Sequence, residues 1–177
     1  MKRILLFRYH HQFKRNLELL RFVKYLNPDV DIYGLYGGPA KDFQQSGEIL
    51  KPVLAHNYLI KDKSKEWKWR HSDIAYQLWY NDFGHTVSFD ILHTYEWDLL
   101  YFSPLEEIFS HIPKNAAAFT GLTPIKKIEK KWYWTWHHDK RLEWLDLMKL
   151  VKRDFNYNSQ PYAIIGPGAS LPRDYFE

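Results

Sequence analysis

Short apolar runs alternate with amphipathic stretches along the first part of the chain. Residues 4–8 form an apolar run typical of a buried strand, and residues 13–26 follow with apolar positions at helical spacing. Residues 30–36 again have the pattern of a strand, which Gly37-Gly38-Pro39 ends. A strand, a helix and a strand in this order predict a βαβ unit, whose two strands pair in parallel through a right-handed crossover.

The same alternation continues towards the C-terminus and predicts an α/β protein. Further strands are expected at 56–60, 87–95, 116–121 and 162–165, and longer helices at 67–83 and 139–155. Ser103 would cap a short helix with Pro104 as its first residue, and Ser170 would cap another at the end of the sequence.

We therefore expect a Rossmann-like, mostly parallel sheet flanked by helices. No repeat or linker divides the sequence, so residues 1–177 are expected to form a single α/β domain. The final helical turn predicts that the domain is incomplete at its C-terminal side.

Composition places the chain among soluble globular proteins, with 45% hydrophobic and 26% charged residues. The formal net charge is +4, and basic residues alternate with acidic ones instead of forming the one-sided stripe typical of nucleic-acid binding. Cysteine is absent, which excludes disulfides and thiolate chemistry and fits a reducing compartment. No apolar stretch is long enough to cross a membrane, so we expect a cytoplasmic protein without a transmembrane segment.

Two acidic residues after the predicted strand 87–95 are the best candidates for chemistry. Glu96 and Asp98 are two positions apart, so an extended segment would point both side chains the same way. Paired carboxylates suit a hard divalent cation such as Mn²⁺ or Mg²⁺, and open α/β sheets bind ligands at the carboxyl ends of their strands. Glu-x-Asp is a common tripeptide, and two solvated loop acids are the alternative interpretation.

The order of these features resembles the GT-A class of glycosyltransferases, in which a Rossmann-like sheet binds a nucleotide sugar at the strand ends. That class holds its metal with an acidic Asp-x-Asp motif after the fourth strand, where this chain has Glu96-Trp97-Asp98. The resemblance covers residues 2–109 and, more loosely, the rest. It implies an Mn²⁺ or Mg²⁺ ion bound directly by Asp98, with Glu96 on the metal or on the donor ribose. It also implies a set of residues that bind the donor nucleotide: Tyr9, His10, His11, Gly37, Gly38, Arg70, Asp73 and Glu96.

Aromatic residues make up 18% of the chain and are dense near residue 134. Trp132, Trp134 and Trp136 occupy alternate positions, so an extended segment would present all three on one side. Such a wall of flat rings suits the binding of a sugar acceptor, and packing of the same rings into the core is the alternative.

Two functions fit these patterns. The first is a glycosyltransferase that moves a sugar from a nucleoside-diphosphate sugar to a glycan or other acceptor, with a divalent metal at Glu96 and Asp98. The alternative is a non-catalytic, aromatic-rich module that binds carbohydrate or single-stranded nucleic acid. The strand-end acids disfavour nucleic acid, because they would repel phosphates without a bridging cation. The pattern assigns no catalytic acid or base.

Overall fold

A computed structural model describes residues 1–61, 63–64, 67–68, 71–131, 135, 138–156, 158–159, 161–164 and 168–177. It divides the chain into two compact units: residues 1–118 with 167–177, and residues 119–166. The prediction that these units make up one domain stays a prediction. Among the described residues, no helix is both long and apolar enough to cross a membrane.

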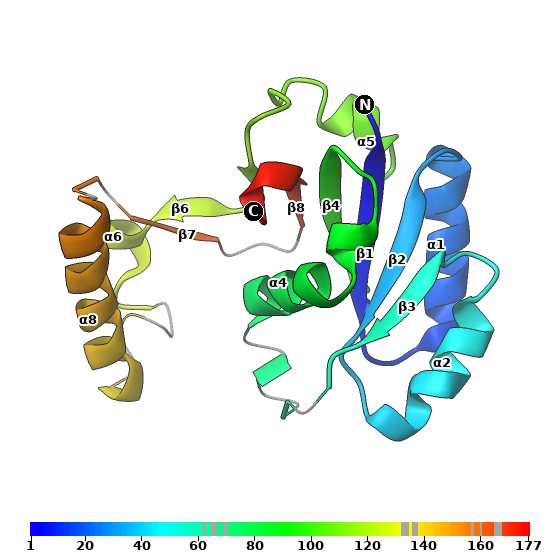
Figure 1. The fold of residues 1–177 in the computed structure, drawn as a ribbon, viewed down its shortest axis with the longest axis horizontal. Helices are drawn as coiled ribbons and strands as arrows, with labels where there is room; N and C mark the ends of the chain where they lie inside the picture. Colours follow the sequence, from blue (N-terminus) through cyan, green and yellow to red (C-terminus); the bar gives the residue numbers. More distant parts are fainter. Residues whose placement is uncertain are drawn as a thin grey trace. The chain divides into compact units, whose positions relative to one another are not determined.

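A six-stranded sheet forms the centre of the larger unit (Figure 1). In spatial order its strands are β3 (His56–Leu59), β2 (Asp31–Tyr36), β1 (Arg3–Tyr9), β4 (Ile91–Glu96), β8 (Ala169–Pro172) and β5 (Ala118–Phe119). Strands β1 to β4 are parallel, and β8 pairs with β4 in antiparallel register. The predicted mostly parallel α/β sheet is therefore confirmed.

Helices cover both faces of this sheet, which explains the unbroken apolar run in β1. On one face lie α1 (Phe13–Leu26) and α2 (Phe43–Leu50), and on the other lies α4 (Ser72–Asp82) (Figure 1). Since successive strand residues face opposite sides, Leu5 and Phe7 meet α1 and α2, whereas Tyr33 of β2 packs its ring 5.8 Å from Trp79 of α4.

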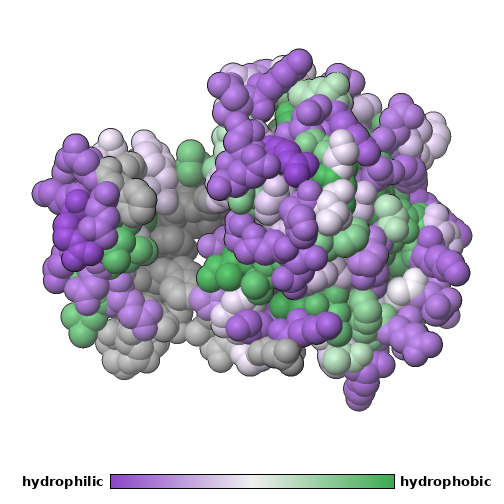
Figure 2. Space-filling model, viewed as in Figure 1, coloured by the Kyte–Doolittle hydropathy of each residue, from purple (hydrophilic) through white to green (hydrophobic). Residues whose placement is uncertain are grey.

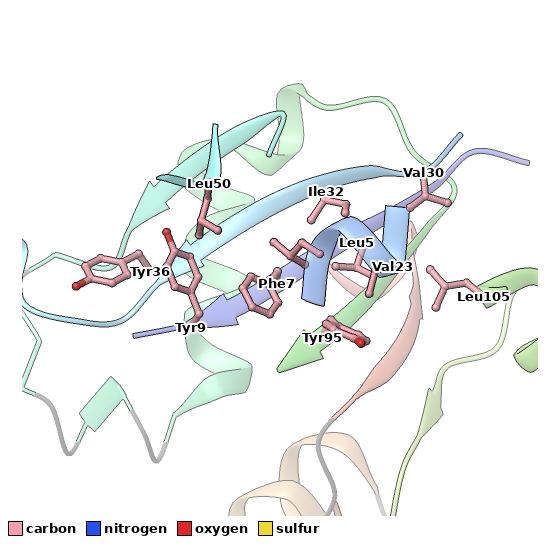
Figure 3. Close-up of a cluster of buried hydrophobic side chains, with 11 residues drawn as sticks. Leu5, Phe7, Tyr9, Val23, Val30, Ile32, Tyr36, Leu50, Tyr95 and Leu105 are labelled. Carbon is pink, nitrogen blue, oxygen red and sulfur yellow. The ribbon is translucent and has the colours of Figure 1, made fainter. Parts of the chain in front are cut away.

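The core under α1 and α2 is a cluster of eleven buried side chains (Figure 3). The phenyl ring of Phe7 stacks on Tyr9 at 5.3 Å and contacts Tyr95 at 6.0 Å. Complete burial of a side chain of this size contributes roughly 1.5–3 kcal/mol. The aromatic residues of the larger unit thus serve first as core, and they hold the three central strands in register.

Several predicted boundaries differ from the structure for identifiable reasons. Residues 67 and 68 are helical as expected, but His71 has non-helical dihedral angles, so the predicted helix is interrupted there and α4 begins at Ser72. The short helix α5 (Leu105–Ile108) is not capped by Ser103: Pro104 is its N-cap, and the Oδ1 atom of Asn27 accepts a hydrogen bond from the Leu105 N–H at 2.8 Å. This cap comes from 78 residues away in sequence.

The end of the sequence is also corrected. Residues 169–172 do not start a helix but form β8, in which Ser170 lies opposite His93. Only a 3₁₀ turn follows, at Arg173–Tyr175. Ser170 is buried within the sheet instead of capping a helix end.

The smaller unit contains a two-stranded antiparallel ribbon of β6 (Leu122–Pro124) and β7 (Tyr162–Ile164), with α6 (Ile125–Ile128) and α8 (His138–Phe155). Its face in Figure 2 is mainly hydrophilic, interrupted by hydrophobic residues. Four leucine side chains of α8 are exposed to solvent: Leu142, Leu145, Leu147 and Leu150. Nine of the 25 Lys and Arg residues but only five of the 21 Asp and Glu residues belong to this unit, which therefore carries the whole net charge of +4.

Candidate active site

The carboxyl ends of β1, β2 and β4 lie side by side in the larger unit. In the parallel register Tyr9 lies opposite Tyr36, and Arg8 lies opposite Glu96. Strand β1 has β2 on one side and β4 on the other, so the chain changes direction across the sheet at this point. Open α/β sheets bind ligands in the crevice that forms at such a switch point.

A buried ion pair joins β1 to β4 at this edge. The Nε atom of Arg8 lies 2.7 Å from Oε1 and 2.9 Å from Oε2 of Glu96. The hydroxyl of Tyr76, from α4, donates to Oε1 of Glu96 at 3.1 Å. The side chains of Arg8 and Glu96 are only 17% and 9% exposed, so both charges depend on each other for stabilisation.

Burial and the neighbouring charges both shift the pKa values of this cluster. Burial lowers the pKa of Arg8, but the nearby carboxylates of Glu96 and Asp98 more than compensate, so the pKa of Arg8 rises above its usual value. Burial and the Glu96 carboxylate raise the pKa of Tyr76, which therefore remains a hydrogen-bond donor. Burial also raises the pKa of Glu96, against the opposing effect of Arg8.

Asp98 lies in a different environment from Glu96. Strand β4 ends at Glu96, and the N–H of Leu99 donates to the Glu96 carbonyl at 3.0 Å, which closes a turn through Trp97 and Asp98. The predicted extended geometry of residues 96–98 is therefore wrong. The turn leaves Asp98 exposed while Glu96 faces α4.

The two acids differ in how well they would suit a divalent cation. Asp98 offers an exposed carboxylate, which fits a cation that also takes oxygens from phosphate and water. Both oxygens of Glu96 are already used by Arg8 and Tyr76, so Glu96 does not fit while this pair persists. Within the described part of the chain, no three His, Cys, Asp or Glu side chains form a group that could hold a metal.

Three rings connect the acidic turn to the end of β1. The imidazole rings of His10 and His11 lie 4.1 Å apart, and Trp97 lies 4.4 Å from His11 and 5.5 Å from His10. The carbonyl of His11 accepts a hydrogen bond from Asn16 of α1 at 2.7 Å. Gln12 then adopts the left-handed conformation, with φ 57°, where the chain turns into α1.

The end of β2 contributes backbone groups that other side chains approach closely. The N–H of Gly37 donates to the Tyr9 carbonyl at 2.8 Å. A Cβ atom at Gly38 would overlap the Tyr36 phenol and lie 2.6 Å from the His10 carbonyl, so this position needs glycine. The Lys68 ammonium donates to the Gly38 carbonyl at 3.3 Å, and the Lys68 carbonyl accepts from Nη1 of Arg8 at 3.2 Å.

The structure thus brings together seven of the residues expected at the site: Tyr9, His10, His11, Gly37, Gly38, Glu96 and Asp98. Tyr9 is a core residue whose hydroxyl donates to Ser46, and it reaches the site through its carbonyl. Asp73 is exposed on the first turn of α4. The pKa of Tyr175 is raised first by the burial of Tyr175 and then by the negative charge of Asp73. The remaining expected residues lie outside the described residues: Arg70, Trp132, Trp134 and Trp136.

Four residues to which the sequence assigned no role lie at this candidate site: Arg8, Lys68, Tyr76 and Trp97. Arg8 is the last charged position of an otherwise apolar strand, and that anomaly was its only signal in the sequence. Nothing in the sequence pairs Arg8 or Tyr76 with Glu96, because these contacts span 88 and 20 residues.

The fold of this chain is similar to that of a solved glycosyltransferase structure. The galactosyltransferase LgtC, in complex with donor and acceptor sugar analogues, aligns with 98% of this chain at a TM-score of 0.50 and 11% sequence identity. The fold is that of GT-A-type glycosyltransferases. The chain spans 59% of the length of LgtC.

Two further glycosyltransferase structures align with this chain at lower TM-scores. Apo GlyE of Streptococcus pneumoniae TIGR4 aligns with 90% of this chain, over 41% of the GlyE chain, at 14% identity and a TM-score of 0.37. Apo mouse xyloside xylosyltransferase 1 aligns with 97% of this chain, over 66% of the xylosyltransferase chain, at 8% identity and a TM-score of 0.41. No protein-family model and no curated protein matches the sequence.

Proposed function

We propose that this protein is a glycosyltransferase that moves a sugar from a nucleoside-diphosphate sugar to a glycan or other acceptor. One observation carries the proposal: a GT-A-type sheet places an exposed carboxylate, Asp98, at the strand-end switch point between β1 and β4. Strands β1 and β2 end at this same edge, so the expected donor-binding segments that follow them begin there.

The residues at this edge suit the parts of a nucleotide sugar. Gly37 is half-buried at the end of β2, and a Cβ there would have no atom closer than 3.8 Å, so a ribose or a phosphate could approach its backbone; Gly38, packed against the Tyr36 phenol, is buried. The Lys68 ammonium, beside Gly38, supplies positive charge for a diphosphate. The rings of His10, His11 and Trp97 offer flat surfaces for the base.

A divalent cation, Mn²⁺ or Mg²⁺, is part of the proposal, with Asp98 as its ligand from the protein. When bound, it would neutralise charge on the departing diphosphate. Lys68 lies on the Gly38 side of the edge and Asp98 on the β4 side, so the protein would contact the diphosphate from both sides of β1.

The test is a thermal-shift screen of UDP, GDP, CDP and their common sugar conjugates, with and without Mn²⁺. A ligand that binds only the folded state at about 100 times its Kd adds about 2.7 kcal/mol, or roughly 5–10 °C in Tm. We expect one nucleotide to give such a shift, to need Mn²⁺, and to lose the shift in Asp98→Asn. Transfer of the sugar from the responding conjugate would then be measured with glycan acceptors.

The matched control is Asp29→Asn, which removes an exposed carboxylate before β2, at the amino ends of the strands. This variant should keep the full nucleotide shift. If a folded wild-type sample responds to no nucleotide, the transferase proposal is wrong. Binding of glycans or single-stranded RNA in that case would support the aromatic-rich binding module instead.

A further inference from the structure

Glu96 is committed to the interior of the larger unit. Each of its two carboxylate oxygens lies within 3 Å of Nε of Arg8, at 2.7 and 2.9 Å, and Tyr76 donates a third contact at 3.1 Å. A cation bound by Glu96 would lie beside the Arg8 guanidinium, and like charges repel strongly where burial lowers the dielectric constant. A shift of Glu96 towards a cation would also leave the buried guanidinium without its partner.

Arg8 connects this buried pair to both charged groups that face the proposed donor. Through Nη1 it donates to the Lys68 carbonyl at 3.2 Å, and Lys68 in turn reaches Gly38. The backbone carbonyl of Arg8 accepts from the N–H of Trp97 at 3.2 Å, in the turn that presents Asp98. A single residue thus fixes the segment of Lys68 and the turn of Asp98 relative to each other.

Resting on the proposed function, we propose that Glu96 is a positioning residue and not a ligand of the cation. Glu96 holds the Arg8 side chain, this side chain holds the Lys68 segment, and Asp98 is the sole carboxylate of the Glu-Trp-Asp motif that contacts the cation. The motif then has one acid for the fold and one acid for the ligand.

The binding test compares two isosteric changes. Mn²⁺, followed by its electron paramagnetic resonance signal, is titrated into Glu96→Gln and Asp98→Asn, alone and with UDP, GDP or CDP. Asp98→Asn should lower Mn²⁺ affinity about 100-fold or more, whereas Glu96→Gln should lower it by less than about tenfold, the small end of the range for residues behind a metal ligand. Gln keeps an oxygen that can accept from Arg8.

In the stability test the order is reversed: the change at Glu96 should lower Tm more than the change at Asp98. Glu96→Gln should lower Tm by roughly 10 °C because it breaks a buried ion pair, whereas Asp98→Asn should leave Tm within about 2 °C. The double variant Arg8→Met with Glu96→Leu replaces the pair by apolar side chains and should recover most of the lost Tm. Nucleotide affinity of the double variant should nevertheless stay about tenfold low, because Met cannot donate to the Lys68 carbonyl.

Two results would overturn the proposal. The first is a Glu96→Gln variant that keeps its Tm and loses Mn²⁺ affinity as severely as Asp98→Asn, which would make Glu96 a ligand. The second is a double variant that recovers both Tm and nucleotide affinity, which would make the pair only structural. If the wild type binds no nucleotide, the transferase proposal fails by itself, and an unchanged Tm in Glu96→Gln would still refute the commitment of Glu96 to the interior.

Discussion

The two ends of the parallel strands use the same kinds of charged residue in opposite ways. At the amino ends, Nζ of Lys2 lies 3.8 Å from Asp31, and their side chains are 50% and 45% exposed. At the carboxyl ends, Arg8 and Glu96 lie 2.7 Å apart and are 17% and 9% exposed. An exposed pair contributes about 0–1 kcal/mol, whereas breaking a buried pair costs about 3–5 kcal/mol.

This difference shows where the fold has accepted a costly arrangement. A buried pair gains little net stability over apolar side chains of the same size, so its presence needs another reason. Buried and electrostatically perturbed groups gather at functional sites more often than elsewhere. The carboxyl edge, with its buried charges and close backbone contacts, is for this reason the edge at which we propose the functional site.

The largest expected effect on stability comes from removing the basic residue of the buried ion pair, compared with removing the basic residue of the exposed pair. Arg8→Met leaves the buried Glu96 carboxylate without its guanidinium and should lower the free energy of unfolding by about 3–5 kcal/mol. Lys2→Met breaks only the exposed pair and should lower it by at most about 1 kcal/mol. Urea unfolding at pH 7 measures both, and equal losses would contradict the comparison.

A second effect lies between the two ends, at His93 in the middle of β4. Burial, with a smaller contribution from the Arg3 charge, lowers the pKa of His93 to about 3. Below pH 6.5 the unfolded chain therefore binds a proton that the folded chain does not, and stability falls as the pH drops from 6.5 towards 3. The loss should reach about 2–3 kcal/mol at pH 4.5.

Urea unfolding at pH 7.0, 5.5 and 4.5 tests this pH dependence. His93→Gln should be flatter than the wild type over this range, because Gln does not titrate. His111→Gln removes an exposed histidine and should keep the wild-type slope. A wild-type slope in His93→Gln would show that another group causes the acid loss.

The smallest of the three effects concerns the adjacent glycines at the end of β2. Gly38→Ala forces a Cβ against the Tyr36 phenol and the His10 carbonyl, and we expect a loss of about 1–3 kcal/mol. At Gly37 the nearest atom to such a Cβ is 3.8 Å away, an ordinary contact, so Gly37→Ala is the matched control. Thermal unfolding of both variants checks the difference, and equal Tm values would refute the close approach at Gly38.

The elements of the larger unit could be predicted where one local pattern decided them. The apolar run of β1 and the helical spacing of α1 are unambiguous, and both elements form within one residue of their expected bounds at either end. Residues 169–172 were misassigned because Ser170 and Pro172 fit a helix start as well as a short strand. Pairing with β4, 75 residues away, decided between them.

That the expected segments meet at one edge of the sheet could be predicted, but the contacts among their side chains could not. Parallel strands that end in His10-His11, Gly37-Gly38 and Glu96-Trp97-Asp98 must meet at one edge. The different environments of Glu96 and Asp98 depend on Arg8 and Tyr76, which reach Glu96 from another strand and from a helix. Alternation along a strand cannot foresee the turn that ends β4 between the two acids.

The late position of β8 in the chain has a consequence for synthesis. The Ala169 N–H donates to Thr94 across 75 residues, so β4 has no partner on that side until those residues have been made. At about 5–20 residues per second, this takes roughly 4–15 s on the ribosome. During that interval β4 presents an open strand edge, the kind of surface that recruits chaperones or pairs with other chains. The strand that bears the acidic motif is thus open to mispairing until residues 169–172 have been made.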